Sequence, residues 1–274
     1  MSFSINTNTA SLLSNMYNRR TSQRMNLSSE RLSSGLRLNN SADDAAGMQI
    51  ANQLRTQNQG LIQGNKNAND AIGLVKIADG AMQEYSNLLV LARDKAVQAA
   101  SDTNSDEARN ALEEDVKQLM SQADDIAKQT QYNGIKLLDG TFTDKKFHVG
   151  SEAGQTIGMS IANTDIASQN IADDDLDLTT QSGANDAITS LDAAIKSIDG
   201  IRSSIGSTQN ALESRVRVND VTAANVKAAE SQIRDVDYAE ESSNYQKLSL
   251  QMQAGAWATS KAMESQSLIM SFLR

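Results

Sequence analysis

Apolar residues recur at alternating steps of three and four positions between residues 61 and 99 of this chain. Such a two-in-seven spacing places one apolar stripe along one side of a helix, which is the pattern of helices that pack side by side. We therefore expect a long helix here, with Gly64 as the single interruption of its stripe. The stripe comprises Leu61, Gly64, Ala68, Ala71, Val75, Ala78, Met82, Tyr85, Leu89, Ala92, Ala96 and Ala99.

A second series with the same spacing runs from residue 188 to residue 233, and four polar residues interrupt it. An unbroken helix over this range would be roughly 70 Å long at ~1.5 Å per residue. The chain contains no proline, the residue that breaks helix interiors, and this favours long uninterrupted helices. The series is Ile188, Leu191, Ile195, Ile198, Arg202, Ile205, Gln209, Leu212, Val216, Asn219, Ala223, Val226, Glu230 and Ile233.

The pattern changes between these two helices. A shorter helix is predicted from the apolar positions 112, 116, 119, 123 and 126, with Asn104 and Glu107 as a capping pair at its start. Two turns follow, because Asn133-Gly134 and Asp139-Gly140 tolerate positive φ. Apolar residues then alternate with polar ones, which predicts a small β-hairpin at 145–162.

Both chain ends carry apolar residues on more than one helical face, over 5–38 and over 238–273. A single partner helix covers only one stripe, so the other faces imply contacts with neighbouring molecules. Neither end buries enough surface by itself to offset its ordering entropy. The predicted fold class is mainly α: a long antiparallel helical bundle or coiled coil with a small β-hairpin region, plus paired terminal helices that order on polymerisation.

Charge and composition exclude several classes of function. With 25 lysines and arginines against 34 aspartates and glutamates, the net charge is −9, which disfavours nucleic acid as a partner. There is no cysteine and hence no disulfide or thiolate site. No uncharged apolar run reaches the ~18 residues of a membrane span. The N-terminal sequence lacks the pattern of a cleaved leader, so we expect export by another route and no membrane insertion.

Three groups of residues raise the question of catalysis or metal binding. Asp43 and Asp44 are adjacent, but neighbouring helical side chains diverge by roughly 100°, so we expect Ser41 to cap a helix with both aspartates in its first turn. The acidic run at 173–177 mimics a calcium loop, yet it lacks the required glycine and glutamate. His148, the only histidine, is expected on the exposed face of a strand. We therefore predict no catalytic residues, no cofactor and no metal.

Several longer motifs resemble the conserved regions of bacterial flagellin. The run "ERLSSGLRLNNSADDAAGMQIANQLRTQNQGLIQGNKNANDAIGLVKIADGAM" at 30–82 resembles the N-terminal region. The runs "SIGSTQNALESRV", "AAESQIRDVDYAEE" and "SLIMSFLR" resemble the C-terminal region. The motifs lie in the family's order and together cover nearly all of 1–140 and 185–274.

The resemblance implies a secreted, extracellular structural subunit that self-assembles into the flagellar filament for swimming motility. It implies an inner core domain formed by 1–40 with 235–274, and an outer helical bundle formed by 41–234 with the hairpin around 135–180. The implied partners are further copies of the chain, a chaperone on the C-terminal segment, the flagellar type III export apparatus, and the filament cap and hook-junction proteins. The filament-packing residues are expected to be Leu12, Leu13, Met16, Tyr17, Leu32, Leu36, Leu248, Met252, Trp257, Leu268, Ile269, Phe272 and Leu273. The joint between the domains is expected at Gly35, Ser41, Asp43, Asp44 and Gly47.

The sequence also leaves alternatives and shows departures from the family pattern. A hook–filament junction protein has similar ends, and it is the alternative function. A carboxylate-dependent metalloenzyme and a cytoplasmic coiled-coil scaffold explain fewer of the motifs. Near residue 91, Leu91 and Lys95 replace an arginine and a leucine of the segment that an innate immune receptor recognises in many flagellins, so recognition by that receptor is not predicted.

Overall fold

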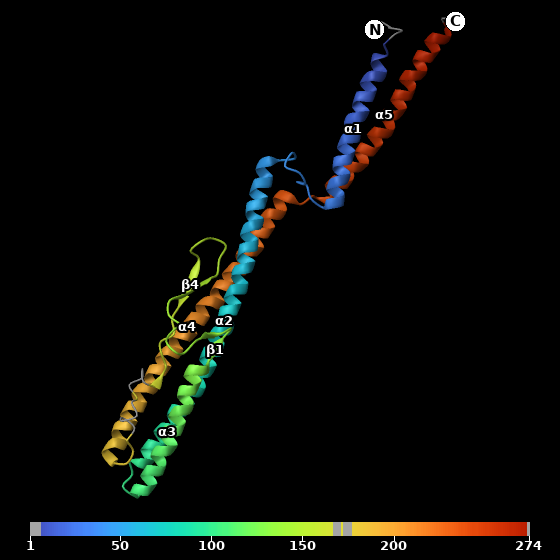
Figure 1. Cartoon of the computed structure of the whole chain (residues 1–274). Coiled ribbons are helices and arrows are strands. Elements are labelled where there is room, and N and C mark those ends of the chain that lie inside the picture. Colours follow the sequence, from blue (N-terminus) through green and yellow to red (C-terminus); the bar gives the residue numbers. More distant parts are fainter. Residues whose placement is uncertain (1–6, 167–170, 172–176, 273–274) are drawn as a thin grey trace. The chain divides into compact units, whose positions relative to one another are not determined.

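The computed structural model describes residues 7–166, 171 and 177–272, with side chains of the last helix described up to residue 265 (Figure 1). The described chain is mainly helical and carries two small antiparallel strand pairs, which confirms the predicted fold class. The helices are α1 (Thr9–Ser34), α2 (Ala45–Ala99), α3 (Asp106–Gln129), α4 (Gln181–Arg234) and α5 (Tyr238–Phe272).

The chain forms two compact units. The terminal unit consists of residues 1–56 with 225–274, and the central unit consists of residues 57–224. The units therefore divide at 56/57 and 224/225, whereas the domains expected from the sequence divide at 40/41 and 234/235. The segment expected to be a joint lies wholly inside the terminal unit.

The central unit is a bundle of α2, α3 and α4 that lie alongside one another (Figure 1). α2 and α4 run antiparallel to each other, because Arg93 of α2 pairs with Asp192 of α4 and Asp79 of α2 pairs with Arg202 further along α4. The predicted stripe of α2 is buried from Leu61 to Ala99, and Tyr85 at its middle is fully buried. The periodicity therefore identified the core face of this helix correctly.

Two glycines of α2 lie directly beneath the backbone of residues 149–151. A Cβ atom added at Gly64 would lie 2.7 Å from the backbone carbon of Val149, and one added at Gly60 would lie 2.9 Å from the Cα atom of Ser151. Real Cβ atoms do not approach other heavy atoms this closely. Glycine at both positions therefore lets the backbone of residues 149–151 rest directly on the helix.

The polar interruptions in the stripe of α4 have polar partners. Asn219 is 2% exposed, and its amide nitrogen donates to the backbone oxygen of Val149 at 2.7 Å and to Oδ1 of Asn65 at 2.9 Å. This side chain thus links α4 to α2 and to the segment after β3. The four pairings are Arg202 with Asp79, Gln209 with Glu213, Asn219 with Asn65, and Glu230 with Lys227.

The strands form two hairpins. β3 (Lys145–His148) pairs with β4 (Thr156–Met159) in antiparallel register, which confirms the predicted hairpin, and His148 on β3 is exposed as expected. The pair β1 (Gln131–Tyr132) and β2 (Ile135–Lys136) was not predicted. Its turn residues Asn133 and Gly134 have φ values of 50° and 77°, so the tight turn itself was predicted correctly.

The start of α3 differs from the prediction. Ser105, not Asn104, is its N-cap, and the Ser105 hydroxyl accepts a hydrogen bond from the backbone N–H of Ala108 at 3.3 Å. Asn104 instead donates its side-chain amide to the backbone oxygen of Gln98. Both residue types cap helices, and Asn104 is held by the end of α2.

Candidate assembly surface

The terminal unit is built on the pairing of α1 with α5, which run antiparallel, side by side (Figure 1). Their contact is made of small and polar groups. The hydroxyl oxygens of Ser14 and Thr259 are 2.7 Å apart, and the Asn18 amide nitrogen donates to the same threonine hydroxyl at 3.0 Å. Closer to the N-terminal end of α1, the Asn8 amide nitrogen donates to the backbone oxygen of Ala262 at 3.0 Å.

Small residues let the two helices approach closely. Ser11 and Ser28 of α1 are buried, and a Cβ atom added at Gly255 of α5 would overlap the side-chain oxygen of Asn18. Serine and glycine leave little apolar area inside this contact, and Leu248 of α5 is the one large apolar side chain of the two helices that is buried among the described residues.

Several large apolar side chains of α1 and α5 lie on the surface. On α1, Leu12 is 64% exposed and Tyr17 is 56% exposed. On α5, Leu250 is 65% exposed and Trp257 is 69% exposed. Burying such side chains is strongly favourable, and contiguous exposed apolar faces are typical of interaction surfaces. We call the exposed large apolar side chains within residues 12–17 and 250–263 the outward apolar face; it comprises Leu12, Leu13, Met16, Tyr17, Leu250, Trp257 and Met263.

The structure places the residues expected to pack in a filament in different environments. Leu12, Leu13, Met16, Tyr17 and Trp257 belong to the outward apolar face, which also includes Leu250 and Met263, residues that the sequence analysis did not select. Leu32, Leu36 and Met252 are half-buried. Leu248 is 5% exposed and therefore already packs within its own chain. The side chains of Leu268, Ile269, Phe272 and Leu273 lie outside the described residues.

The segment that leaves α1 is fixed by backbone geometry. Gly35 ends the helix with φ of 72°, a left-handed conformation that suits glycine, and its N–H donates to the backbone oxygen of Arg31 at 2.9 Å. The backbone N–H of Arg37 donates to the oxygen of Arg234 at 2.7 Å, and that of Val236 donates to the oxygen of Gly35 at 3.1 Å. These bonds tie the α1–α2 connection to the α4–α5 connection as a short antiparallel bridge, which the sequence did not reveal.

The expected role of Ser41 as a helix cap is wrong. Ser41 lies in a turn, and α2 begins at Ala45. Asp44 caps the helix, because its Oδ1 accepts a hydrogen bond from the backbone N–H of Gly47 at 3.0 Å. The physical reason is that residues 39–43 fold into their own turn, so the helix cap lies three residues later than the sequence suggested.

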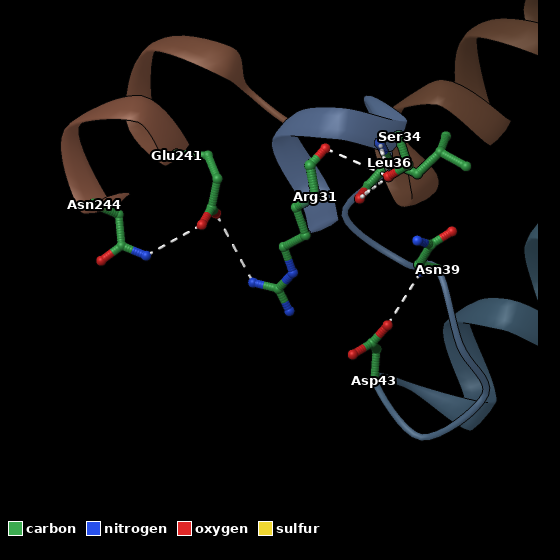
Figure 2. Close-up of polar contacts among 7 residues, drawn as sticks. All are labelled: Arg31, Ser34, Leu36, Asn39, Asp43, Glu241 and Asn244. Carbon is green, nitrogen blue, oxygen red and sulfur yellow. Dashed lines mark hydrogen bonds and ion pairs between the residues drawn. The ribbon is translucent and has the colours of Figure 1, made fainter. Parts of the chain in front are cut away.

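Asp43 stabilises that turn rather than a helix. Its Oδ2 accepts hydrogen bonds from the backbone N–H groups of Asn40 at 3.0 Å and Asn39 at 3.1 Å, the second of which is drawn in Figure 2. The bond from Asn40, followed by the bond from Asn39, lowers the pKa of Asp43 below its ordinary value. Asp43 and Asp44 thus each hold backbone N–H groups, and they do not converge on a common ligand.

Metal sites and membrane-spanning helices are the other features considered for the described residues. The described residues include no group of three or more histidines, aspartates or glutamates arranged to hold a metal ion. Asp173 and Asp175 of the acidic run lie outside the described residues. No described helix is both long and apolar enough to cross a membrane.

These features define a class: a helical structural protein whose chain ends pair and present apolar side chains outward. Comparison with known families gives the identity. The model of the bacterial flagellin N-terminal helical region matches residues 5–143, and the model of the bacterial flagellin C-terminal helical region matches residues 188–273. The chain belongs to the bacterial flagellin family. It is a structural subunit of the flagellar filament and not an enzyme.

Relatives of similar length support this assignment. The chain is 35% identical to a flagellin of Halalkalibacterium halodurans over 89% of this chain and 90% of the relative. It is also 35% identical to flagellin FlaB2 of Treponema pallidum over 96% of this chain and 98% of the relative. The flagellar filament 33 kDa core protein of Treponema phagedenis has the same identity and coverage.

Solved structures agree with the fold. The crystal structure of Bacillus cereus flagellin is 30% identical and superposes with a TM-score of 0.51, covering 56% of this chain and 88% of that one. A putative flagellar hook-associated protein from Vibrio parahaemolyticus superposes with a TM-score of 0.59 over 70% of this chain and all of that one, but at 14% identity. The second likeness concerns the fold alone, and no finding favours the hook-junction function.

Proposed function

We propose that this chain polymerises through the outward apolar face of α1 and α5, which neighbouring copies cover in the filament. The observation that carries the proposal is the contrast between the two sides of the helix pair. Small and polar groups such as Ser14 and Thr259 face inward, whereas Leu12 and Trp257 are more than half exposed. When a surface of one copy fits a different surface of the next and the rotation does not close, an open helical polymer results.

We also propose that the chain has two domains with different positions in the filament. Residues 1–40 with 235–274 form the inner core domain of the filament, and residues 41–234 form the outer bundle with the hairpin region. Gly35, Ser41, Asp43, Asp44 and Gly47 lie in the connection between them and form the inter-domain joint. The αL turn at Gly35 and the hydrogen bonds of both aspartates support this role, because they fix the path of the connection.

The same surface suggests how the monomer is handled before assembly. An exposed apolar face on α5 invites premature association, so we infer that an export chaperone covers the C-terminal segment. The flagellin family of the chain, rather than this surface, leads us to propose passage through the flagellar type III export apparatus. For the same reason we propose contacts with the filament cap and hook-junction proteins at the ends of the polymer. The finished filament is extracellular.

Seeded elongation tests the proposal. Purified chain carrying Leu12→Ser and Trp257→Ser should elongate filament seeds poorly, because both substitutions remove apolar area that neighbours would bury. We expect the critical concentration to rise by at least tenfold, which corresponds to ~1.4 kcal/mol of lost contact energy. Sedimentation of the polymer at several protein concentrations measures it.

A control separates lost contact from general damage. Asn15→Ser with Gln253→Ser truncates two exposed polar residues of the same helices, and this variant should elongate like the unmodified chain. Circular dichroism should show equal helix content in both variants. The proposal is wrong if the apolar variant elongates as well as the control.

A further inference from the structure

A small hollow lies between α1 and α5 near the end of α1, with a volume of about 190 Å³. Three of the side chains that line it are basic: Arg24 and Arg31 from α1, and Lys247 from α5. Glu241 is the single acidic residue among the described lining residues. We call this feature the basic hollow.

The basic groups are poorly matched within the chain. The shortest distance between the Arg31 guanidinium and the Glu241 carboxylate is 3.9 Å, as drawn in Figure 2. The same carboxylate also accepts a hydrogen bond from the Asn244 amide at 3.2 Å. Among the described residues, no salt bridge involves Arg24 or Lys247. The lining of the hollow therefore contains three cations and one carboxylate.

A buried donor in the wall of the hollow also lacks a partner. Ser28 is 2% exposed, and its hydroxyl makes no hydrogen bond to any described residue. The Nε atom of Arg31 is likewise without an acceptor among the described residues. A buried polar group without a partner is destabilising, so a hydroxyl and a guanidinium N–H on the hollow together indicate a site for an oxygen acceptor. Carboxylates meet this need, because they accept several hydrogen bonds and pair with guanidinium groups.

The charge distribution of the chain indicates where such a carboxylate comes from. The terminal unit contains 11 lysines and arginines against 9 aspartates and glutamates, whereas the central unit contains 14 against 25. The acidic balance of the chain therefore resides entirely in residues 57–224. In a polymer of identical subunits, the basic hollow of one copy and the acidic central unit of another have complementary charges.

We propose that the basic hollow binds an aspartate or glutamate side chain from the central unit of a second copy of this chain. The carboxylate accepts hydrogen bonds from the Ser28 hydroxyl and the Arg31 guanidinium, while Arg24 and Lys247 close over it. This inference rests on the proposed function, since it needs neighbouring subunits. The carboxylate contact adds a polar, directional contact to the one made by the outward apolar face. Such polar contacts fix the register between neighbouring subunits more than they add affinity.

Zero-length cross-linking tests the inference directly. Filaments are grown from equal amounts of ¹⁴N-labelled and ¹⁵N-labelled chain and treated with a carbodiimide, which joins an ammonium group to a carboxylate in contact with it. Mass spectrometry of the digest should reveal mixed-isotope peptides that join Lys247 to an acidic residue within 57–224. The inference is overturned if filaments form but Lys247 is joined only within its own chain, or only to residues outside 57–224. Failure to form filaments at all contradicts the proposed function as well.

Substitutions provide a second, independent readout. Arg24→Gln with Lys247→Gln should raise the critical concentration by about tenfold and reduce its dependence on salt, because screening acts on the charges that have been removed. The matched control Arg19→Gln with Arg55→Gln removes two exposed cations of the same unit that do not line the hollow, and should change elongation by less than about twofold. Equal effects of the two double variants would overturn the inference.

Discussion

At the scale of single residues, the connection between α1 and α2 is organised by two neighbouring aspartates with different tasks. Asp43 closes the turn over residues 39–43, and Asp44 caps α2 through the backbone N–H of Gly47. A Cβ atom added at Gly47 would meet Oδ2 of Asp44, so a larger residue there would displace the capping carboxylate. The paired carboxylates are therefore structural, and each is satisfied by the backbone that it organises.

The cap can be tested by comparing two alanine substitutions. Asp44→Ala should weaken the start of α2 by about 1 kcal/mol, the usual contribution of a helix cap. We expect the amide of Gly47 to exchange with solvent about fivefold faster in this variant, measured by hydrogen exchange at residues 45–50. Ser41→Ala is the matched control and should leave that exchange unchanged. A larger effect at Ser41 than at Asp44 would contradict this assignment.

At the scale of elements, the helices of the central unit were predicted well because their signal is local. The stripe from Leu61 to Ala99 records burial at helical spacing, and spacing is visible in any single sequence. The sequence could not explain why glycine occupies position 64 or asparagine position 219. Both residues lie against the backbone of Val149, which is distant from them in the sequence. The pair β1–β2 was missed because strands of two residues carry no periodicity.

The candidate assembly surface was predicted in part. Sequence alone showed that the ends have apolar residues on several faces, but not which face meets the partner helix. The structure assigns the inner face to residues such as Ser11 and Ser28, so hydrophobicity alone was a poor guide to the intramolecular contact. Leu248 was expected to pack against neighbouring copies, but it is buried within its own chain.

Asn219 allows a test at this scale. Asn219→Ala removes the donor to the backbone oxygen of Val149 and to Oδ1 of Asn65, and it leaves both oxygens without this hydrogen bond. We expect the central unit to lose about 1–3 kcal/mol of stability, measured by thermal unfolding of the monomer followed by circular dichroism. Asn210→Ala, at an exposed position of the same helix, should cost less than about 0.5 kcal/mol. Equal losses in the two variants would show that the link to residue 149 is unimportant.

At the scale of the whole molecule, the two units differ in how much apolar surface they bury. The central unit has a continuous core that includes Met82, Tyr85 and Leu89. In the described part of the terminal unit, the buried apolar side chains are Leu38, Ala51 and Leu248 alone. So small a core contributes little against the entropy of ordering two long helices. We therefore propose that the terminal unit gains most of its stability from neighbouring subunits.

The central claim, that neighbouring copies cover the outward apolar face, is tested most directly by the fluorescence of Trp257. It is the only tryptophan of the chain, and its side chain is 69% exposed in the monomer. We expect polymerisation to shift its emission to shorter wavelength and to reduce acrylamide quenching several-fold, because a neighbour's apolar side chains exclude water and quencher. Emission and quenching that remain those of the monomer in sedimented filaments would contradict the claim.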